Sequence, residues 1–453
     1  MTPMRSTAIF PIDDPHAWKK RLLHWAAGRD IAAYLDSNGR AGGWECLVAA
    51  GAVSILETKA GQAFPALASF REKTGSDWLF GFFGYDLKNE TERLSSSHVD
   101  GVGLPDLGFF QPETVAGIRQ GRLEIYTLRQ SPEEVFQDIT LVALPENTPK
   151  KIEKARLRPR IPKPDYLRTV EAIRQHIIEG DVYEMNLCQE FYAENTSISP
   201  LAVFGRLNTI GQSPFAVFLR WRDRYLLSAS PERFLKKEGR QLISQPIKGT
   251  RRRGKTAAED DLIRQELAAS EKDRAENVMI VDLVRNDLAR NCLPGSVRVD
   301  ELFGIYSFPT VHQMISTVSG TLEEKEGTGI LNGTYPDLPY SLRALRDAFP
   351  PGSMTGAPKV MAMELIERYE RTRRSLYSGA AGYFDPSGDF DFNVVIRSIL
   401  YNAADRYVSV QVGGAIVFDS EAEQEYEECL IKAEAMMRAL EIPPAGNPEL
   451  SGH

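Results

Sequence analysis

Glu232 and Lys248 flank a segment with the pattern of a β-hairpin, which would bring an acid and an amine together. The apolar stretches 234–237 and 241–245 are joined by a short turn at Gly239, and strands joined this closely must pair antiparallel. Counted outward from that turn, Glu232 and Lys248 face each other to within one position. Such a pair could perform acid–base or nucleophilic chemistry. The alternative is an ion pair at the rim of the sheet, which would contribute little to stability.

Carboxylates recur at helical spacing in the predicted helix over residues 421–440. The Ser-x-x-Glu pattern that begins at Ser420 predicts a capping box at its start. Glu425, Glu428 and Lys432 then share one face, on which the carboxylates could hold Mg²⁺ and the lysine could bind an anionic group. A solvated face without a ligand is the alternative interpretation.

A second predicted helix, residues 260–288, carries Asp273 and Glu276 one turn apart above apolar residues. Acidic side chains on the inward side of a helix need a cation or another partner, so this helix could share a Mg²⁺ site with the first one. Two glycine-rich turns, residues 349–359 and 412–415, could present backbone N–H groups to an anion. Purely structural turns are the alternative for both.

The elements that must position these groups follow a mixed α and β pattern. Further helices are predicted over residues 165–179, where Gly180 supplies the C-cap, and over 358–371. Strands are predicted over residues 78–85, 182–192, 214–221, 225–230, 394–401 and 407–412. The predicted organisation is an N-terminal region (1–145), a linker rich in Pro, Lys and Arg (146–164), a main domain (165–441) and a tail (442–453).

The composition excludes several classes of protein. The chain has 453 residues, of which 42% are hydrophobic, so it can bury a sizeable core. Its net charge is −8 and its one dense basic run is residues 251–253, so no nucleic-acid partner is expected. Apolar runs shorter than about 18 residues exclude a membrane helix, and the first residues lack a signal-peptide pattern, which predicts a cytoplasmic location. Four widely spaced cysteines indicate buried thiols rather than a disulfide scaffold or a zinc ribbon.

Several short segments together identify a family. They are residues 180–183 (Gly-Asp-Val-Tyr), 230–234 (Ser-Pro-Glu-Arg-Phe), 246–251 (Pro-Ile-Lys-Gly-Thr-Arg), 273–277 (Asp-Arg-Ala-Glu-Asn), 281–288 (Val-Asp-Leu-Val-Arg-Asn-Asp-Leu), 354–359 (Met-Thr-Gly-Ala-Pro-Lys), 377–379 (Tyr-Ser-Gly) and 425–429 (Glu-Tyr-Glu-Glu-Cys). In this order they resemble the chorismate-utilising enzymes, and among these the component I family of aminodeoxychorismate synthases. The resemblance covers most of residues 165–440.

The resemblance implies an α+β fold in which two antiparallel sheets pack as a sandwich, with helices outside and the active site between the layers. It implies that Glu276, Glu425 and Glu428 hold a Mg²⁺ that bridges to a carboxylate of chorismate. The other groups it implies for substrate binding are the side chains of Tyr377, Arg397, Thr250, Ser353 and Lys432 and the backbone N–H groups of Gly249, Gly413, Gly414 and Ala415. Chorismate is a dianion, which a metal, an arginine and several amides could bind.

Lys248 decides the subfamily within this resemblance. Anthranilate synthases carry alanine at that position, whereas the aminodeoxychorismate type carries a lysine that attacks C2 of chorismate as the 4-hydroxyl departs. Glu232 is then the acid that protonates the hydroxyl. A neutral amine is needed for the attack, so burial or the cations at residues 251–253 are expected to lower the pKa of Lys248.

The implied product is 4-amino-4-deoxychorismate, on the route to 4-aminobenzoate and folate. Its ammonia would come from a separate glutamine amidotransferase subunit, because no glutaminase nucleophile is visible. Anthranilate synthase component I is the first alternative. The second is a non-catalytic tryptophan-binding relative, with residues 35–38 as a weak match to the tryptophan site. Glu184 stands where isochorismate and salicylate synthases have a lysine base, and Gln313 stands where many relatives have histidine; neither has an assigned role.

Overall fold

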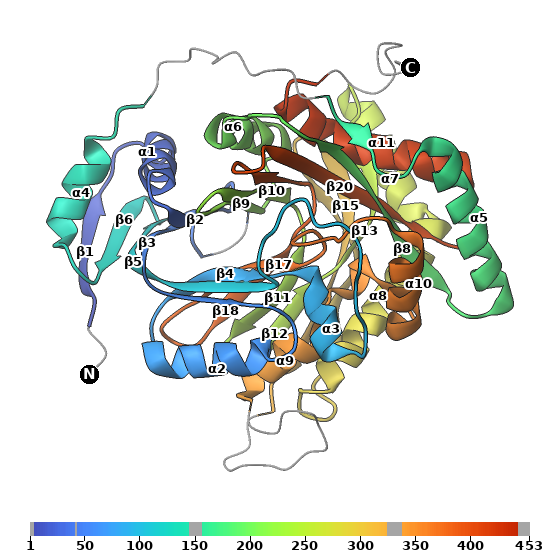
Figure 1. Cartoon of the computed structure of the whole chain (residues 1–453), viewed down its shortest axis with the longest axis horizontal. Coiled ribbons are helices and arrows are strands. Elements are labelled where there is room, and N and C mark those ends of the chain that lie inside the picture. Colours follow the sequence, from blue (N-terminus) through green and yellow to red (C-terminus); the bar gives the residue numbers. More distant parts are fainter. Residues whose placement is uncertain (1–3, 41–42, 145–155, 324–337, 443–453) are drawn as a thin grey trace.

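The strands form one continuous antiparallel network that folds into two layers (Figure 1). The computed structural model describes residues 4–40, 43–144, 156–323 and 338–442. The first layer runs in the order β8 (Glu184–Ala193), β20 (Tyr407–Ile416), β19 (Ser398–Asn402), β10 (Arg224–Ser230), β9 (Phe215–Trp221), β2 (Ile31–Asp36), β3 (Cys46–Thr58), β5 (Leu107–Arg119), β6 (Arg122–Thr127) and β1 (Ser6–Pro11).

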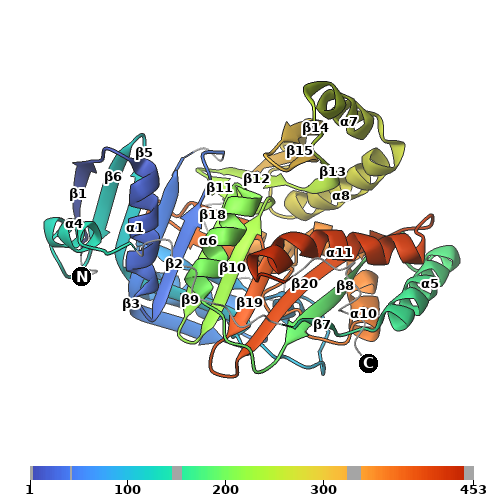
Figure 2. The same ribbon diagram turned by 90° about the horizontal axis from the view of Figure 1, so that it is seen from above.

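The second layer starts from the same long strand β5. It continues through β4 (Leu79–Phe83), β17 (Ala380–Phe384), β18 (Phe390–Val394), β11 (Arg233–Glu238), β12 (Gln241–Gln245) and β15 (Val311–Thr321), which also pairs with β13 (Ile247–Arg252) and β14 (Arg298–Ser307). The short strands β7 (Arg158–Pro159) and β16 (Gly356–Ala357) pair with β8. β13, β14 and β15 project with two helices beside the rest of the body (Figure 2).

Strands β3 and β5 connect the two layers because they bend in the middle. In β3 the residues up to Ala50 pair with β2, and the register against β5 then shifts between Ala52 and Ser54. Gly51 has φ +69°, a backbone conformation that glycine adopts without steric cost, and such a bulge bends a strand. The predicted sandwich is therefore confirmed as two packed layers, although the hydrogen bonding is continuous between them.

Three apolar clusters fix the layers and the helices that cover them. Between the layers, Trp221 of β9 contacts Phe82 and Phe110 of β4 and β5, with ring centroids 5.2 and 6.0 Å apart. One outer face is covered by α1 (Pro15–Ala27), α4 (Pro132–Thr140), α5 (Lys163–Glu179), α6 (Pro200–Gly211), α10 (Lys359–Tyr369) and α11 (Ala422–Ala439). The other is covered by α2 (Ala63–Thr74), α8 (Glu271–Ala289) and α9 (Tyr340–Ala348). Burial of this apolar surface is the main stabilising term.

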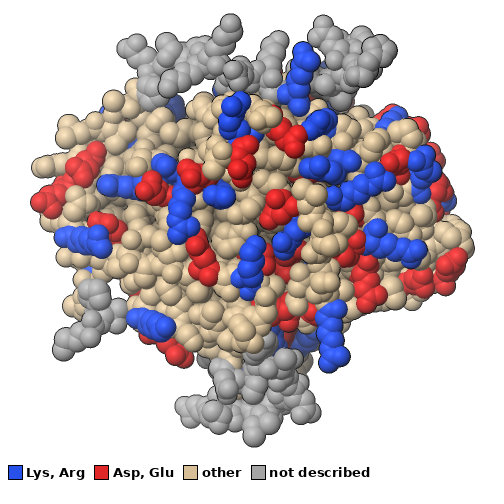
Figure 3. All heavy atoms as spheres, viewed as in Figure 1, with Lys and Arg blue, Asp and Glu red and all other residues tan. Residues whose placement is uncertain are grey.

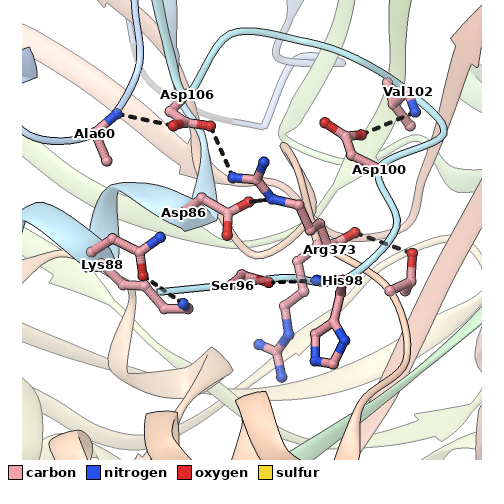
Figure 4. A network of polar contacts seen from close by, with 12 residues as sticks. Ala60, Asp86, Lys88, Ser96, His98, Asp100, Val102, Asp106 and Arg373 are labelled. Carbon is pink, nitrogen blue, oxygen red and sulfur yellow. Dashed lines mark hydrogen bonds and ion pairs between the residues drawn. The ribbon is translucent and has the colours of Figure 1, made fainter. Parts of the chain in front are cut away.

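The N-terminal region is joined to the main domain by strand pairing and by a polar network. β2 pairs with β9 and β4 pairs with β17. At the network, the Arg373 guanidinium lies 3.1 Å from Asp86 and 3.4 Å from Asp106, which also accepts a hydrogen bond from the backbone of Ala60 (Figure 4). The backbone N–H of Arg373 donates to the carbonyl of Val99. The described part of the N-terminal region therefore shares a sheet with the main domain.

Some elements that the sequence predicts differ in the structure. The predicted helix 260–288 is two helices, α7 (Ala257–Ala269) and α8, because Ser270 is extended and caps α8 by accepting from the N–H of Asp273. The predicted strand 394–401 is interrupted between β18 and β19. The capping box at Ser420 does not form, because α11 begins at Ala422 with Glu421 at its N-cap, and the Ser420 hydroxyl accepts from the N–H of Val417 and donates to Glu425. Within the predicted linker, residues 158–159 form β7 and α5 begins at Lys163; residues 146–155 and the tail beyond Ile442 lie outside the described residues.

Charges of both signs are mixed over the face seen in Figure 3, without a large area of one sign. Among the described residues, no helix combines the length and apolarity needed to cross a bilayer.

Candidate functional site

A cavity of about 730 Å³ brings the predicted site residues together. Its walls come from β8, β13, β20, α8, α11 and the turn before α10, so segments from most of the main domain meet there. Every predicted site residue except Gly414 lines it: Glu232, Lys248, Gly249, Thr250, Glu276, Ser353, Tyr377, Arg397, Gly413, Ala415, Glu425, Glu428 and Lys432. The cavity is large enough for a small dianion together with a metal and water.

The hairpin that positions Glu232 has the predicted register next to its turn, but a bulge between Arg233 and Lys236 shifts the pairing by one residue before Glu232. Lys237 pairs with Leu242 and Glu238 with Gln241, which places the turn where the sequence indicated. Glu232 is buried and its Oε1 accepts a hydrogen bond of 2.6 Å from Ser353 Oγ. Burial raises the pKa of Glu232 to about 7, against the opposing effects of Ser353 and Lys248. This carboxyl group can therefore hold a proton near neutral pH.

Lys248 is buried in the same cavity, but its direct partner is not Glu232. Its Nζ donates to Glu184 Oε1 at 2.5 Å and lies 3.9 Å from Glu276 Oε2. Glu184 begins β8 and is 1% exposed, so this contact joins β13 to β8 inside the protein. The alternative interpretation, an ion pair between Glu232 and Lys248 at the rim of the sheet, is wrong. Both side chains are buried, and Lys248 contacts other carboxylates.

The expected lowering of the pKa of Lys248 is also wrong. Burial does lower it, but the neighbouring carboxylates of Glu184 and Glu276 outweigh burial and raise the pKa of this amine. The three consecutive arginines form ion pairs with other residues: Arg251 with Asp273, Arg252 with Glu434 and Arg253 with Asp260. Lys248 is therefore held as an ammonium when no substrate is present.

Glu276, Glu425 and Glu428 face one region of the cavity. Burial raises the pKa of Glu276 and of Glu425, while the ion pair with Lys432 outweighs burial and lowers the pKa of Glu428. The Lys272 ammonium acts on all three carboxyl groups in the direction that favours their charged form. Three carboxylates from α8 and α11 that share one cation fit a site for a hard divalent metal.

The space around Glu425 and Glu428 also fits a metal site. A Cβ on Gly414 would lie 3.0 Å from Glu425 Oε2 and 3.7 Å from Glu428 Oε1, so the carboxylates occupy room that any larger residue would fill. The three carboxylates do not form a closed cage. Within the described ranges, the set of metal-binding atoms that all lie within 4.8 Å of one another belongs to His176, Glu179 and Asp181 at the end of α5. Mg²⁺ tolerates wider spacing because it keeps several water or substrate ligands.

Tyr377 and Arg397 line the cavity from the links around β17 to β19. Arg397 has φ +52°, an unfavourable backbone conformation for a residue with a side chain, at the interruption between β18 and β19. Its Nη1 donates to the backbone carbonyl of Lys432 at 3.2 Å. Burial lowers the pKa of this arginine and raises that of Tyr377. An arginine that lines a cavity can bind a carboxylate through two parallel hydrogen bonds.

Residues 349–359, the first of the two predicted glycine turns, connect α9 to α10 through a short 3-10 helix, Gly352–Met354, and β16. Gly249 lies in β13 with φ +85°, at a register shift between Ile247 and Thr250, which explains why glycine is needed there. Gly413, Gly414 and Ala415 are not in a turn; they lie within β20 and pair with β8. The turn expectation for residues 412–415 is therefore wrong.

Arg374 is a buried residue behind the cavity wall that sequence reasoning missed. Its guanidinium pairs with Glu370 at 2.6 Å and donates to the backbone carbonyls of Met354 and Asn186 at 2.7 and 2.9 Å. It thereby joins the turn that carries Ser353 to β8. No periodic pattern marks an arginine in a link between elements, so only its place in the sequence just before Tyr377 could have drawn attention to it.

Residues 35–38, the weak match to a tryptophan site, are engaged within the chain. The Asp36 carboxylate accepts from Lys19 at 2.8 Å and from the Tyr34 hydroxyl at 2.9 Å, and Asn38 donates to Asn208. All four cysteines are free and buried, as predicted. Gln313 lines the cavity, and its Oε1 is buried without a hydrogen-bond partner in the part of the chain that the structure describes.

The sequence matches the family described as chorismate binding enzyme over residues 14–438. A protein of Salmonella typhimurium named aminodeoxychorismate synthase component 1 is 36% identical over 363 residues, which cover 80% of this chain and 76% of that protein. A protein of Thermus thermophilus named anthranilate synthase component 1 is 36% identical over 377 residues, covering 81% and 78%. The crystal structure of anthranilate synthase component I from Streptococcus pneumoniae has a TM-score of 0.72 and 26% identity, covering 86% of this chain and 92% of that one. Overall identity thus does not separate these two named activities.

Proposed function

The chain belongs to the family of chorismate-binding enzymes, and on that premise we propose that it replaces the 4-hydroxyl of chorismate with an amino group. The product would be 4-amino-4-deoxychorismate, a precursor of 4-aminobenzoate and folate. Relatives named aminodeoxychorismate synthase component 1 support this proposal. The observation that carries it is the buried amine of Lys248 inside the cavity, at the position where the resemblance gives anthranilate synthases an alanine.

In the proposed mechanism Lys248 Nζ bonds to C2 of chorismate while Glu232 gives its proton to the departing 4-hydroxyl. Ammonia then bonds to C4 and the C2–Nζ bond breaks. A covalent intermediate divides one difficult substitution into two easier displacements. The Ser353 hydroxyl orients Glu232, and Tyr377 and Arg397 bind one substrate carboxylate. Glu276, Glu425 and Glu428 would hold Mg²⁺, which when bound would neutralise the other carboxylate.

Product identification tests this proposal against its alternatives. The purified chain would be incubated with chorismate, Mg²⁺ and ammonium, and the product identified by chromatography and mass spectrometry. A C4-aminated product is expected. Anthranilate would identify an anthranilate synthase component I, and recovery of unchanged chorismate would favour a non-catalytic relative.

The isolated chain is expected to use ammonium but not glutamine. A glutaminase needs a reactive thiolate, whereas burial raises the pKa of each of the four cysteines, including Cys292, whose pKa is about 11. The measurement compares the two nitrogen donors at equal concentration, with and without a separate glutamine amidotransferase. Efficient use of glutamine by the chain alone would contradict the proposed dependence on a partner subunit.

The rate is expected to fall as the pH rises above about 7. Glu232 acts as an acid, so it must be protonated at the start of the reaction, and its pKa is raised to about 7 by burial. Ser353→Ala removes a hydrogen bond that lowers this pKa, so the alkaline limb of kcat/KM should move to higher pH in the variant. If the alkaline limb of kcat/KM lies at the same pH in Ser353→Ala as in the parent, a group other than Glu232 controls it.

A further inference from the structure

The contact between Glu184 and Lys248 raises a chemical requirement that the proposed mechanism leaves open. An amine that is paired with carboxylates carries three protons and has no lone pair with which to bond to carbon. One proton must therefore leave Nζ before or during its attack on C2. The acceptor has to lie within hydrogen-bond distance of Nζ.

Glu184 is the carboxylate that meets this requirement. Its Oε1 lies 2.5 Å from Lys248 Nζ, whereas Glu276 Oε2 lies at 3.9 Å, beyond hydrogen-bond distance. Glu232 does not qualify, because an acid that protonates the leaving hydroxyl must itself begin protonated. Among the carboxylates near Nζ, this leaves Glu184.

Glu184 is buried and held in place beside Lys248. The side chain is 1% exposed, and its Oε2 is buried with no hydrogen-bond partner among the described residues. Its position is also fixed, because Glu184 starts β8 and its neighbour in the ladder is Ala357 of β16.

We propose that Glu184 is the catalytic base that takes a proton from Lys248 Nζ and later returns it. The inference rests on the proposed amination and deepens it. In the first half, Glu184 becomes a neutral acid, the Nζ lone pair bonds to C2, the ring double bonds shift toward C4, and the hydroxyl leaves as water with the proton of Glu232. In the second half, ammonia bonds to C4, the double bonds shift back and the C2–Nζ bond breaks. Glu184 then protonates the released amine, and Glu232 regains a proton from the new C4 ammonium group.

Glu184→Gln distinguishes two roles of Glu184: accepting a proton from Lys248 and merely orienting Lys248. Glutamine has the same shape and its oxygen still accepts a hydrogen bond from Nζ, but it cannot take up the proton. We expect kcat to fall about a hundredfold, the usual contribution of a general base, with KM for chorismate changed less than about threefold. Glu184→Asp, which keeps a carboxylate, should recover part of the lost rate.

Glu190→Gln is the matched control. Glu190 lies on the same strand, is equally buried and pairs with Arg160 at 2.9 Å, but it does not line the cavity. It should keep the parent rate. Thermal unfolding of each variant verifies that it is folded, and Glu184→Asp provides the comparison if the glutamine variant is unstable.

Intact-protein mass spectrometry with chorismate and no ammonium provides a second measurement. The parent should form an adduct on Lys248, and Glu184→Gln should form it about a hundredfold more slowly. An adduct that forms at the parent rate in Glu184→Gln, while the parent makes the C4-aminated product, would overturn the role of Glu184 alone. A parent that forms neither adduct nor product would overturn the proposed function and this inference together.

Discussion

Replacement of Lys248 with alanine is expected to lower the rate of C4 amination by roughly a thousandfold and to redirect the residual reaction to C2. The physical reason is that the variant loses the nucleophile that occupies C2, so ammonia or water can reach that carbon directly. A thousandfold loss corresponds to about 4 kcal/mol of transition-state stabilisation. The product mixture, identified by mass spectrometry, is the decisive measurement.

In Lys248→Ala, a loss of reaction rate must be distinguished from a loss of folding stability. Removal of one partner of a buried ion pair leaves Glu184 uncompensated, which typically costs about 3–5 kcal/mol. Lys248→Met, which keeps the length of the side chain without its amine, provides a second test with less loss of packing. Lys237→Ala is the matched control, since Lys237 is a buried lysine paired with Asp389 outside the cavity.

The parent product, formed at an unchanged rate by Lys248→Ala, would defeat the covalent mechanism. It would also remove the basis for separating this chain from anthranilate synthases, because overall identity to both is equal. Mass spectrometry adds an independent criterion. The parent should carry a substrate adduct during turnover, and both Lys248 variants should lack it.

Glu276→Gln and Glu428→Gln are each expected to reduce turnover at least a thousandfold at millimolar Mg²⁺ while the protein stays folded. A neutral amide binds a hard cation far more weakly than a carboxylate does. The two residues come from different helices, α8 and α11, so equal loss in both variants is expected only if they serve one site. Calorimetry of Mg²⁺ binding to each variant gives a measure that does not depend on turnover.

Glu423→Gln is the control for this pair. It removes a carboxylate from α11, where Glu423 pairs with Lys163 on the exposed side of the helix. Its Mg²⁺ affinity and its rate should match those of the parent chain. Near-normal rates for Glu276→Gln and Glu428→Gln without added metal would exclude the shared magnesium site.

Local patterns in the sequence determined the parts of the site that lie close together along the chain. The register of β11 and β12 followed from the turn, because a short covalent connection leaves strands one way to pair. The common face of Glu425, Glu428 and Lys432 followed from the helical period, and the ion pair between Glu428 and Lys432 reflects it. The family resemblance then indicated which of these local groups belong to one cavity.

Only the tertiary structure decided what each group contacts. Lys248 and Glu184 are 64 positions apart in the sequence, so no periodicity could pair them, and their contact reversed the expected direction of the pKa of Lys248. The hydroxyl of Ser420 does not cap α11, because the helix begins at Ala422 with Glu421 at its N-cap and Ser420 accepts from the N–H of Val417. A pKa depends on burial and on every charge nearby in space, and these are set by how β8, β13, α8 and α11 pack together.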